Sequence, residues 1–416
     1  MSFTLRCLIA FVVLALSGVA DAAPSDDETL DPGATAFYAV TTSAADGNNV
    51  AIGLLGLGAP SGQDFMAHGR AIAAASAPVS FAEAQTRTKD PKALTIKWDQ
   101  DRMYCWTDDY APFDEDPKCA PLAEAAQTLH DNVELLSRFR QVQKMPPAWG
   151  MTQDLVRTID VTKLTAIEIK VAIRQGRTEE AYRKCVDLYA FWRRMNSAGR
   201  TWVEVAIGLV NEGISLRALE SLLLRAPQVI DRHYDELLVL LTPEIINRFN
   251  FPEIARAEYT MVMKYYQIAE NKSAILPNYL TNRHYRYAQQ LMEIAGKPAS
   301  ELNVIGSRPC KCLKPVELNE NDPRFTASAA FIGPTVFPGV ELIKSMHDKI
   351  RMAGLLTMRI KIAKDKVPDS EIAAYLAANA KDMREPFTNG QMQWDPVRRR
   401  IFFDTPVSAA TAEVRL

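Results

Sequence analysis

Ile173 to Met195 reads IRQGRTEEAYRKCVDLYAFWRRM, and this stretch decides the fold class. Gly176 can end a first helix at a positive φ, and Thr178 can cap a second one, whose first turn holds two glutamates. The apolar residues of the second helix recur at offsets of four and three: Ala181, Cys185, Leu188, Trp192 and Met195. Residues at these offsets share one helical face. The stretch therefore predicts two helices joined by a tight turn, with Cys185 as a buried thiol.

The same helical periodicity covers most of the chain from Leu164 onward. We expect helices over Thr201–Arg225, Gln228–Leu240, Pro243–Phe249, Pro252–Glu270, Thr281–Ala295, Val340–Ala363 and Asp369–Met383. An earlier amphipathic helix is expected over Pro121–Val142, and short apolar runs around Trp394 and Phe402 predict a β-hairpin. The expected fold class is mainly α. It consists of antiparallel helix pairs, a small disulfide-clamped N-terminal segment and a C-terminal β-hairpin.

The first residues have the pattern of a secretory signal peptide. Arg6 supplies positive charge, Cys7 to Leu16 is an unbroken apolar run, and Ala20-Asp21-Ala22 is a small-residue cleavage site. The apolar run is shorter than the roughly 20 residues that span a bilayer. We expect cleavage after Ala22 and a soluble mature protein in the periplasm or outside the cell.

The patterns predict five stretches along the chain. They are a signal peptide at 1–22, a flexible tether at 23–36, an N-terminal segment with a disulfide loop at 37–150, a helical body at 151–385 and a hairpin tail at 386–416. Within the helical body, residues 296–339 are rich in proline and carry a C-x-C motif. We expect an irregular excursion there, because a loop of that length is usually a functional or interface element.

Five cysteines remain after the expected cleavage, and an oxidising compartment permits disulfides. Cys105 and Cys119 flank an acidic loop with two prolines, and we predict that they are bonded. Closing a loop of this length contributes about 3 kcal/mol in the chain-entropy model. Cys310 and Cys312 can bond each other, bond a partner, or bind a metal with ligands from elsewhere. A structural disulfide is the leading reading, because no other cysteine or histidine lies nearby in the sequence.

Composition and charge narrow the classes of partner. The net charge is -2, which gives no support for nucleic acid or an anionic membrane as partner. The most apolar later stretch, Val203 to Leu224, is interrupted by charged residues, so no integral membrane span is expected. The expected partner is another envelope protein.

Ile173 to Tyr182 resembles the helix–turn–helix junction of a tetratricopeptide repeat. There a glycine ends the first helix, and an acidic pair leads to an alanine packed on its neighbour. Gly176, Glu179, Glu180 and Ala181 match this pattern. The match covers one junction, without recurrence at the 34-residue period, so it implies antiparallel helix pairs and not a repeat array.

A set of short motifs spread over the chain resembles an uncharacterised group of exported proteins of Gram-negative bacteria. The motifs are Leu54-Leu-Gly-Leu-Gly-Ala-Pro with Gly69-Arg70, Leu135-Leu-Ser-Arg-Phe, Pro277-Asn-Tyr-Leu-Thr-Asn282, and Pro386-Phe-Thr-Asn-Gly-Gln-Met-Gln-Trp-Asp395 before Ile401-Phe-Phe. The resemblance implies a periplasmic, mainly helical protein and brings no known catalytic residue.

The familiar catalytic signatures are absent from the sequence. It contains no H-E-x-x-H, G-x-S-x-G, S-x-x-K or Walker motif, and its histidines lack metal-ligand spacing. We therefore expect no metal and no cofactor. His284 deserves notice because it lies close to Asn282, although a conformational role for Asn278 and Asn282 at a helix start is favoured over catalysis. Glu220 is expected to face solvent on its helix.

The leading hypothesis is a non-catalytic periplasmic protein that binds or scaffolds another protein. Its candidate interface residues combine arginine with aromatic side chains, which are enriched in interfaces: Trp192, Arg193, Arg194, Trp202 and Arg399. One alternative is an envelope hydrolase of the peptidoglycan type, with carboxylates such as Glu258 or Glu220 brought to a partner by the fold. Another alternative is an inhibitor or immunity protein.

Overall fold

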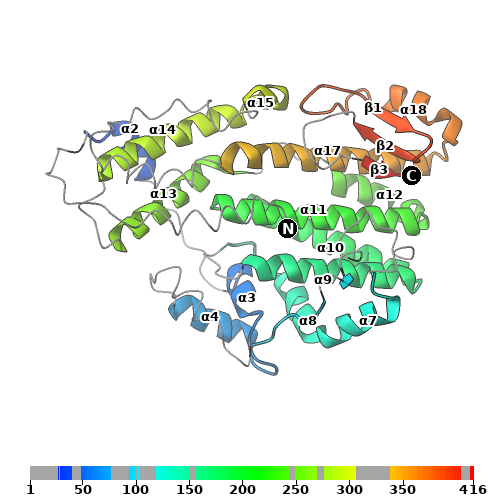
Figure 1. The fold of residues 1–416 in the computed structure, drawn as a ribbon, viewed down its shortest axis with the longest axis horizontal. Coiled ribbons are helices and arrows are strands. Elements are labelled where there is room, and N and C mark those ends of the chain that lie inside the picture. Colours follow the sequence, from blue (N-terminus) through cyan, green and yellow to red (C-terminus); the bar gives the residue numbers. More distant parts are fainter. Residues whose placement is uncertain are drawn as a thin grey trace. The chain divides into compact units, whose positions relative to one another are not determined.

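The computed structural model describes residues 27, 29–39, 48–75, 93–99, 102–103, 106, 119–149, 155–242, 249–268, 276–305, 338–403 and 413–416. The described part is mainly helical with one small antiparallel sheet, which confirms the expected fold class at that level (Figure 1). The predicted signal peptide lies outside these residues, as do Cys105, Cys310 and Cys312. The disulfide clamp therefore stays a prediction.

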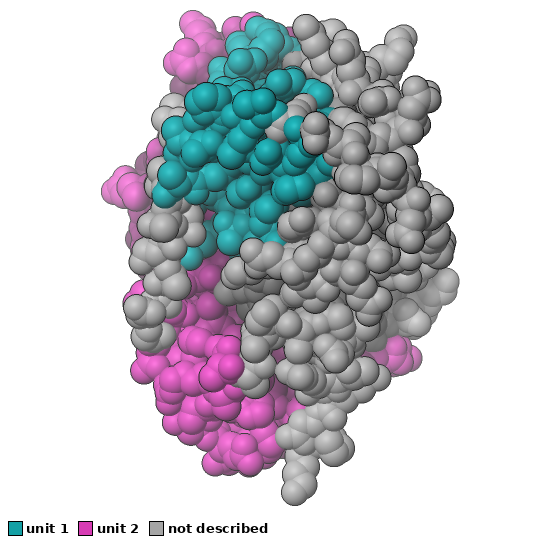
Figure 2. Space-filling view, turned by 90° about the vertical axis from the view of Figure 1, so that its left-hand side faces the viewer, with its two compact units in different colours: residues 1–44, 200–205, 249–345 teal, residues 45–199, 206–248, 346–416 magenta. Residues whose placement is uncertain are grey.

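The chain divides into two compact units that interleave along the sequence. Unit 1 takes residues 1–44, 200–205 and 249–345, and unit 2 takes the remainder, 45–199, 206–248 and 346–416 (Figure 2). The predicted division into consecutive stretches does not reveal this arrangement. Local periodicity reports which residues share a helical face, whereas unit membership depends on contacts between residues far apart in the sequence.

Unit 2 contains most of the helices and the sheet. Its helices are α3 (Val50–Gly56), α4 (Phe65–Ala75), α7 (Leu122–Asp131), α8 (Val133–Val142), α9 (Leu155–Arg174), α10 (Thr178–Ser197), α12 (Gln228–Leu241) and α18 (Ile372–Asn379), with a 3-10 turn at Asp369–Glu371. Two long helices, α11 (Trp202–Arg225) and α17 (Pro338–Lys364), contribute residues to both units.

The predicted helix pair is α9 with α10. Gly176 has a φ of 74° in the turn between them, which a glycine adopts without steric cost. Ala181, Leu188 and Trp192 are buried on the inner face of α10, and Cys185 is a buried free thiol. The pair and the buried cysteine are thus confirmed.

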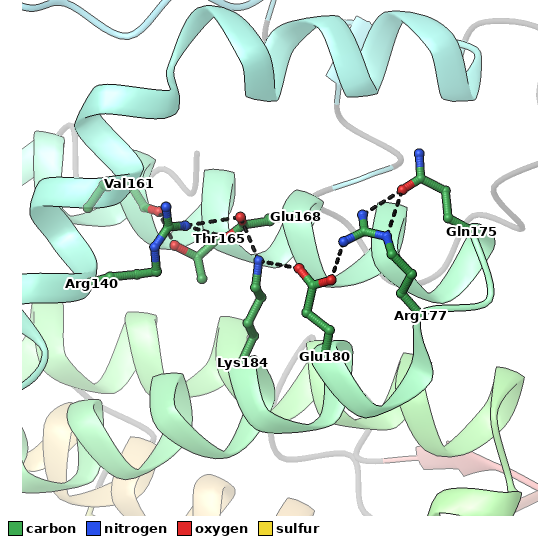
Figure 3. Close-up of polar contacts among 8 residues, drawn as sticks. All are labelled: Arg140, Val161, Thr165, Glu168, Gln175, Arg177, Glu180 and Lys184. Carbon is green, nitrogen blue, oxygen red and sulfur yellow. Dashed lines mark hydrogen bonds and ion pairs between the residues drawn. The ribbon is translucent and has the colours of Figure 1, made fainter.

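A ladder of charged side chains joins α8, α9 and α10 (Figure 3). Glu168 accepts hydrogen bonds from Arg140 at 3.0 and 3.2 Å and forms an ion pair with Lys184 at 2.7 Å. Lys184 also reaches Glu180 at 2.8 Å, and Glu180 pairs with Arg177 in the turn. Because Glu168 and Lys184 are largely shielded from solvent, their ion pair is screened less than an exposed one.

The single helix predicted over Pro121–Val142 is instead two helices, α7 and α8, which meet at Asn132. The Asn132 side chain donates to the carbonyl oxygens of Thr128 and Lys97, and accepts from the Lys97 N–H at 3.0 Å. An asparagine that bonds to the backbone in this way competes with helix continuation. The break depends on Lys97, a residue 35 positions away.

Arg138 of α8 fixes the glycine-rich stretch that follows α3. Its guanidinium donates to the carbonyl oxygens of Ala59 at 2.5 Å and Pro60 at 3.0 Å, and to that of Leu57 at 3.2 Å. The first two motifs of the family resemblance therefore belong to one structural contact. These bonds hold the backbone that follows α3 against α8.

The tail forms three antiparallel strands, β1 (Met392–Asp395), β2 (Arg400–Phe403) and β3 (Glu413–Arg415). Trp394 pairs with Ile401, and Ile401 with Val414. The predicted hairpin is confirmed, and the third strand was not predicted because its 3 residues are too few to establish an alternating pattern.

Unit 1 contains α2 (Pro32–Tyr38), α13 (Phe251–Ile268), α14 (Pro277–Ala295) and α15 (Ala299–Ile305). In Figure 1, α2 lies beside α14. Part of the stretch predicted as a tether, 23–36, lies in α2, and Asp31 caps this helix by accepting from the Gly33 N–H. Within the predicted excursion at 296–339, the structure describes α15 and the first residues of α17.

Candidate functional site

The N-terminal arm, which we define as residues 27 and 29–39, docks on α14 of unit 1. Its first contact is at the start of that helix. The Asp27 carboxylate accepts from the backbone N–H of Asn278 at 2.6 Å and from that of Tyr279 at 3.1 Å. The first N–H groups of a helix lack partners within it and carry positive partial charge, so a carboxylate stabilises them.

One turn further on, the side chain of Asn282 binds the backbone of the arm on both sides of Leu30. Its amide nitrogen donates to the Thr29 carbonyl oxygen at 2.9 Å, and its amide oxygen accepts from the Asp31 N–H at 2.8 Å. Only 3% of Asn282 is exposed, so both bonds form in a shielded position. This pair of bonds recognises an extended backbone, whatever its side chains.

The far end of the arm is held by aromatic side chains. The Tyr38 ring stacks on Tyr259 of α13 with ring centroids 3.8 Å apart, and its phenol oxygen lies 2.6 Å from Nδ1 of His284. Tyr259 in turn hydrogen-bonds Thr281 at 2.9 Å. Burial raises the pKa of Tyr38, so its phenol keeps its proton at neutral pH.

His284 is 1% exposed, and burial lowers its pKa to about 4. The ring is therefore neutral at pH 7. A neutral imidazole carries one proton, and if that proton is on Nε2, then Nδ1 accepts from Tyr38. Among the residues that the structure describes, Nε2 has no hydrogen-bond partner.

Two further contacts fit the arm closely to the same helices. The guanidinium of Arg256 lies 4.6 Å from the centroid of the Phe37 ring, and its Nε donates to the Phe37 carbonyl oxygen at 2.9 Å. A Cβ added to Gly33 would lie 2.8 Å from the Tyr285 hydroxyl, so this position admits a glycine best. We call the residues that receive the arm the arm-binding face: Arg256, Tyr259, Asn278, Tyr279, Asn282, His284 and Tyr285.

Two carboxyl groups lie at the start of α11, also within unit 1. Glu204 accepts from the N–H groups of Arg200 and Thr201 at 2.9 and 3.0 Å, while its own N–H donates to the Thr201 hydroxyl, which is a capping box. Glu258 of α13 accepts from the Trp202 N–H at 2.7 Å. Both carboxyl groups therefore bind helix-terminal N–H groups.

Burial raises the pKa of Glu204 to about 7 against the effect of its hydrogen bonds. Burial also raises the pKa of Glu258 to about 7, and the nearby charge of Glu204 adds to the rise. Carboxyl groups shifted in this way are found at active sites, but also in structural positions.

Four of the predicted interface residues contact other described parts of the protein. Trp192 and Trp202 are 0% and 3% exposed, so neither presents a stacking surface. Arg193 donates to the carbonyl oxygen of Leu240, and Arg194 to that of Gln143 at 2.7 Å. The two tryptophans are apolar core residues, and the two arginines hold neighbouring helix ends.

Arg399 has most of its side chain exposed. It lies in the turn between β1 and β2 at a φ of 48° and pairs with Asp369 at 3.1 Å. Because both side chains are more than half exposed, this ion pair contributes little to stability.

Glu220 does not face solvent as predicted. It is buried, pairs with Arg217 at 2.8 Å and accepts from the Arg415 N–H of β3 at 3.3 Å. The expectation was wrong because the tail strand covers this part of α11, a contact 195 residues apart in the sequence.

The described residues contain no group of three or more potential metal-binding side chains, and the acidic loop at 107–118 lies outside them. Among the described helices, none combines the length and apolar character that a membrane span requires. Comparison with family models, with curated proteins and with solved structures gave no match to this chain.

Proposed function

We propose that the mature protein is an exported, non-catalytic binding protein of the bacterial envelope. It holds an extended segment of another envelope protein on the arm-binding face. The observation that carries this proposal is the paired bonding of Asn282 to the backbone of Thr29 and Asp31. A side-chain amide that satisfies a carbonyl and an N–H two residues apart is suited to binding extended peptide chain.

The chemistry of the rest of the face supports the same role. The helix start that receives Asp27 offers two N–H groups to a carboxylate, and Tyr259 offers an aromatic surface. Each of these groups can be met by a segment of another protein. Backbone bonds supply affinity in such complexes, and pockets for particular side chains supply specificity.

Two parts of the proposal, the export of the protein and its scaffold of helix pairs, rest on sequence patterns. The signal-peptide pattern of residues 1–22 and the resemblance to exported proteins support a periplasmic location. The tetratricopeptide-like junction at Gly176 supports a scaffold of helix pairs, which is an argument from analogy of fold.

An envelope hydrolase is the second candidate, and one observation favours it. Glu204 and Glu258 have raised pKa values near neutrality, as a general acid requires. Against this role, both carboxyl groups accept hydrogen bonds from backbone N–H groups at the start of α11. The binding function therefore accounts for more of the geometry of unit 1.

Photocrosslinking in living cells tests the binding function. Tyr285 of the full chain is replaced by benzoylphenylalanine, with the exposed position Arg286 of the same helix as the control. To keep the arm from occupying the face, the chain also carries Asp27→Ala and Tyr38→Phe. We expect an adduct from position 285 that maps to an extended acidic segment of another polypeptide. The adduct should be lost with Asn282→Ala.

Two crosslinking results would contradict the binding function. If position 285 yields only adducts within its own chain, or the same adducts as position 286, the face does not bind a partner. Solubilisation of peptidoglycan by the purified protein, lost in Glu258→Gln, would then favour the hydrolase.

A further inference from the structure

We infer that the N-terminal arm is an intramolecular ligand of the arm-binding face, which a partner segment of the same chemistry must displace. This inference rests on the proposed function and names the partner class. The partner segment begins extended, carries two carboxylates four residues apart, and ends in a short helix with aromatic side chains, as the arm does.

The arm is held at its surface and not as part of a core. Of its described residues only Ala34 is buried, whereas Thr29, Pro32, Thr35, Ala36 and Ala39 are exposed. Its one helix, α2, has 7 residues, and a helix that short is not stable by itself. Segments with few buried apolar contacts open at the lowest free energy in a protein.

The face beneath the arm is, by contrast, built into the helices. Asn282, His284 and Tyr279 are buried in α14, and α14 runs for 19 residues. A face of this kind keeps its shape when the arm leaves. It then exposes polar groups that water or another peptide must satisfy: the amide of Asn282, two helix N–H groups and the ring of His284.

The contacts of the arm define what a partner must carry. A carboxylate in the place of Asp27 binds the start of α14, and a second one in the place of Asp31 starts the turn of α2. The backbone between them binds Asn282, and an aromatic hydroxyl in the place of Tyr38 stacks on Tyr259 and reaches His284.

A covalently attached ligand competes at an effective concentration of about 1 mM when its linker is short. Wild-type protein should therefore bind a free copy of the arm weakly. A chain whose own arm is weakened, but whose face is intact, should bind the free copy much more tightly.

The test measures fluorescence anisotropy of a labelled synthetic peptide, DDETLDPGATAFYA, which copies residues 26–39. The full mature chain is compared with its Asp27→Ala, Tyr38→Phe double variant, which alters the arm alone. We expect at least tenfold tighter binding to the double variant. Adding Asn282→Ala to the double variant should abolish peptide binding. A peptide in which the residues that correspond to Asp27 and Asp31 are alanine should bind the double variant at least tenfold more weakly.

Three results would overturn the inference. The first is equal affinity of the peptide for the wild type and the double variant, and the second is binding that persists with Asn282→Ala. The third is a wild-type dimer, detected by light scattering, that becomes a monomer with Asn282→Ala, because the arm then binds a second copy. The peptide result does not depend on the crosslinking result. If crosslinking finds a partner but the peptide binds the wild type and the double variant equally, the proposed function stands and this inference fails. If the peptide binds the double variant more tightly but crosslinking finds no partner, the arm is an intramolecular ligand and the proposed function fails.

Discussion

The phenol oxygen of Tyr38 lies 2.6 Å from Nδ1 of His284, a residue 246 positions later in the chain. The contact joins the end of the N-terminal arm to the buried face of α14. Because the pKa of His284 is lowered to about 4, the contact forms with a neutral imidazole at pH 7. The state of one buried ring is thus linked to the docking of the arm.

Acidification should weaken the docked arm. The ordinary pKa of histidine is about 6.5, so the folded state of unit 1 favours the neutral ring. Its contribution to stability is complete above pH 6.5 and is lost as the pH falls toward 4. Among the described residues, the ring of His284 contacts the aromatic rings of Tyr38, Tyr259 and Tyr287.

Urea unfolding of the wild type and of His284→Gln at pH 7.5 and pH 4.5 measures this effect. We expect the stability advantage of the wild type over the variant to shrink at pH 4.5. An advantage that is the same at both pH values would show that folding does not lower the pKa of the ring.

Replacing Asn282 should release the arm. Asn282→Ala removes two hydrogen bonds to the arm backbone, which is worth roughly 2 kcal/mol when the groups left behind are shielded. Asn278→Ala is the matched control, because Asn278 binds Asp27 through its backbone N–H, which alanine retains. Limited proteolysis should cleave the arm of Asn282→Ala at least several-fold faster than that of Asn278→Ala. Equal cleavage would show that the amide does not hold the arm.

The contribution of Glu258 to stability should fall as the pH rises, whereas that of His284 falls as the pH is lowered. Its pKa is raised to about 7 from an ordinary value of about 4.5, so its contribution is complete below pH 4.5 and is lost as the pH rises through 7. Glu258→Gln keeps an oxygen acceptor for the Trp202 N–H and cannot ionise. The variant should match the wild type in urea unfolding at pH 4.5 and exceed it at pH 8.

The control for this prediction is Glu253→Gln, a carboxyl group on the same helix that is less buried. This variant removes a carboxyl group from α13 and leaves the acceptor of the Trp202 N–H in place. If Glu258→Gln is less stable than the wild type at pH 8, the ionised carboxylate is the form that supports the fold.

The turn between α9 and α10 should depend on its glycine. Gly176 has a φ of 74°, and an L-residue at such a φ costs about 1 kcal/mol or more, so Gly176→Ala should lower the free energy of unfolding by about that amount. Gly296, which ends α14 at a φ of -79°, provides the control, and Gly296→Ala should change stability by less than about 0.5 kcal/mol. Equal losses in thermal unfolding would argue against a conformational cause.

The helical part of the fold could be predicted because its signals are local. Ala181, Cys185 and Leu188 recur at helical spacing, and Gly176 precedes them where the turn occurs. The breaks that the sequence does not reveal depend on distant partners. The sequence around Asn132 predicts a continuous helix, and the hydrogen bonds of Asn132 to the Lys97 backbone appear only in the structure.

The candidate site could not be predicted from local sequence patterns, because its contacts also join residues far apart in the chain. The acidic, small residues around Asp27 and Asp31 are typical of a tether, and their contacts with α14 involve residues about 250 positions later. Asn282 and His284 could be noted from the sequence as unusual residues on one helix. The N-terminal arm that both residues bind could not be predicted, because it comes from the other end of the chain.

Amide hydrogen exchange of the arm tests the central claim most directly. The N–H groups of Gly33, Thr35 and Ala39 are hydrogen-bonded within the arm, and they can be compared with buried N–H groups of α14 in the same protein. The account predicts that the arm exchanges through an opening of lower free energy than α14, and that Asn282→Ala lowers it further. Exchange of the arm only together with α14, through unfolding of all of unit 1, would contradict the account and make the arm a fixed part of the fold.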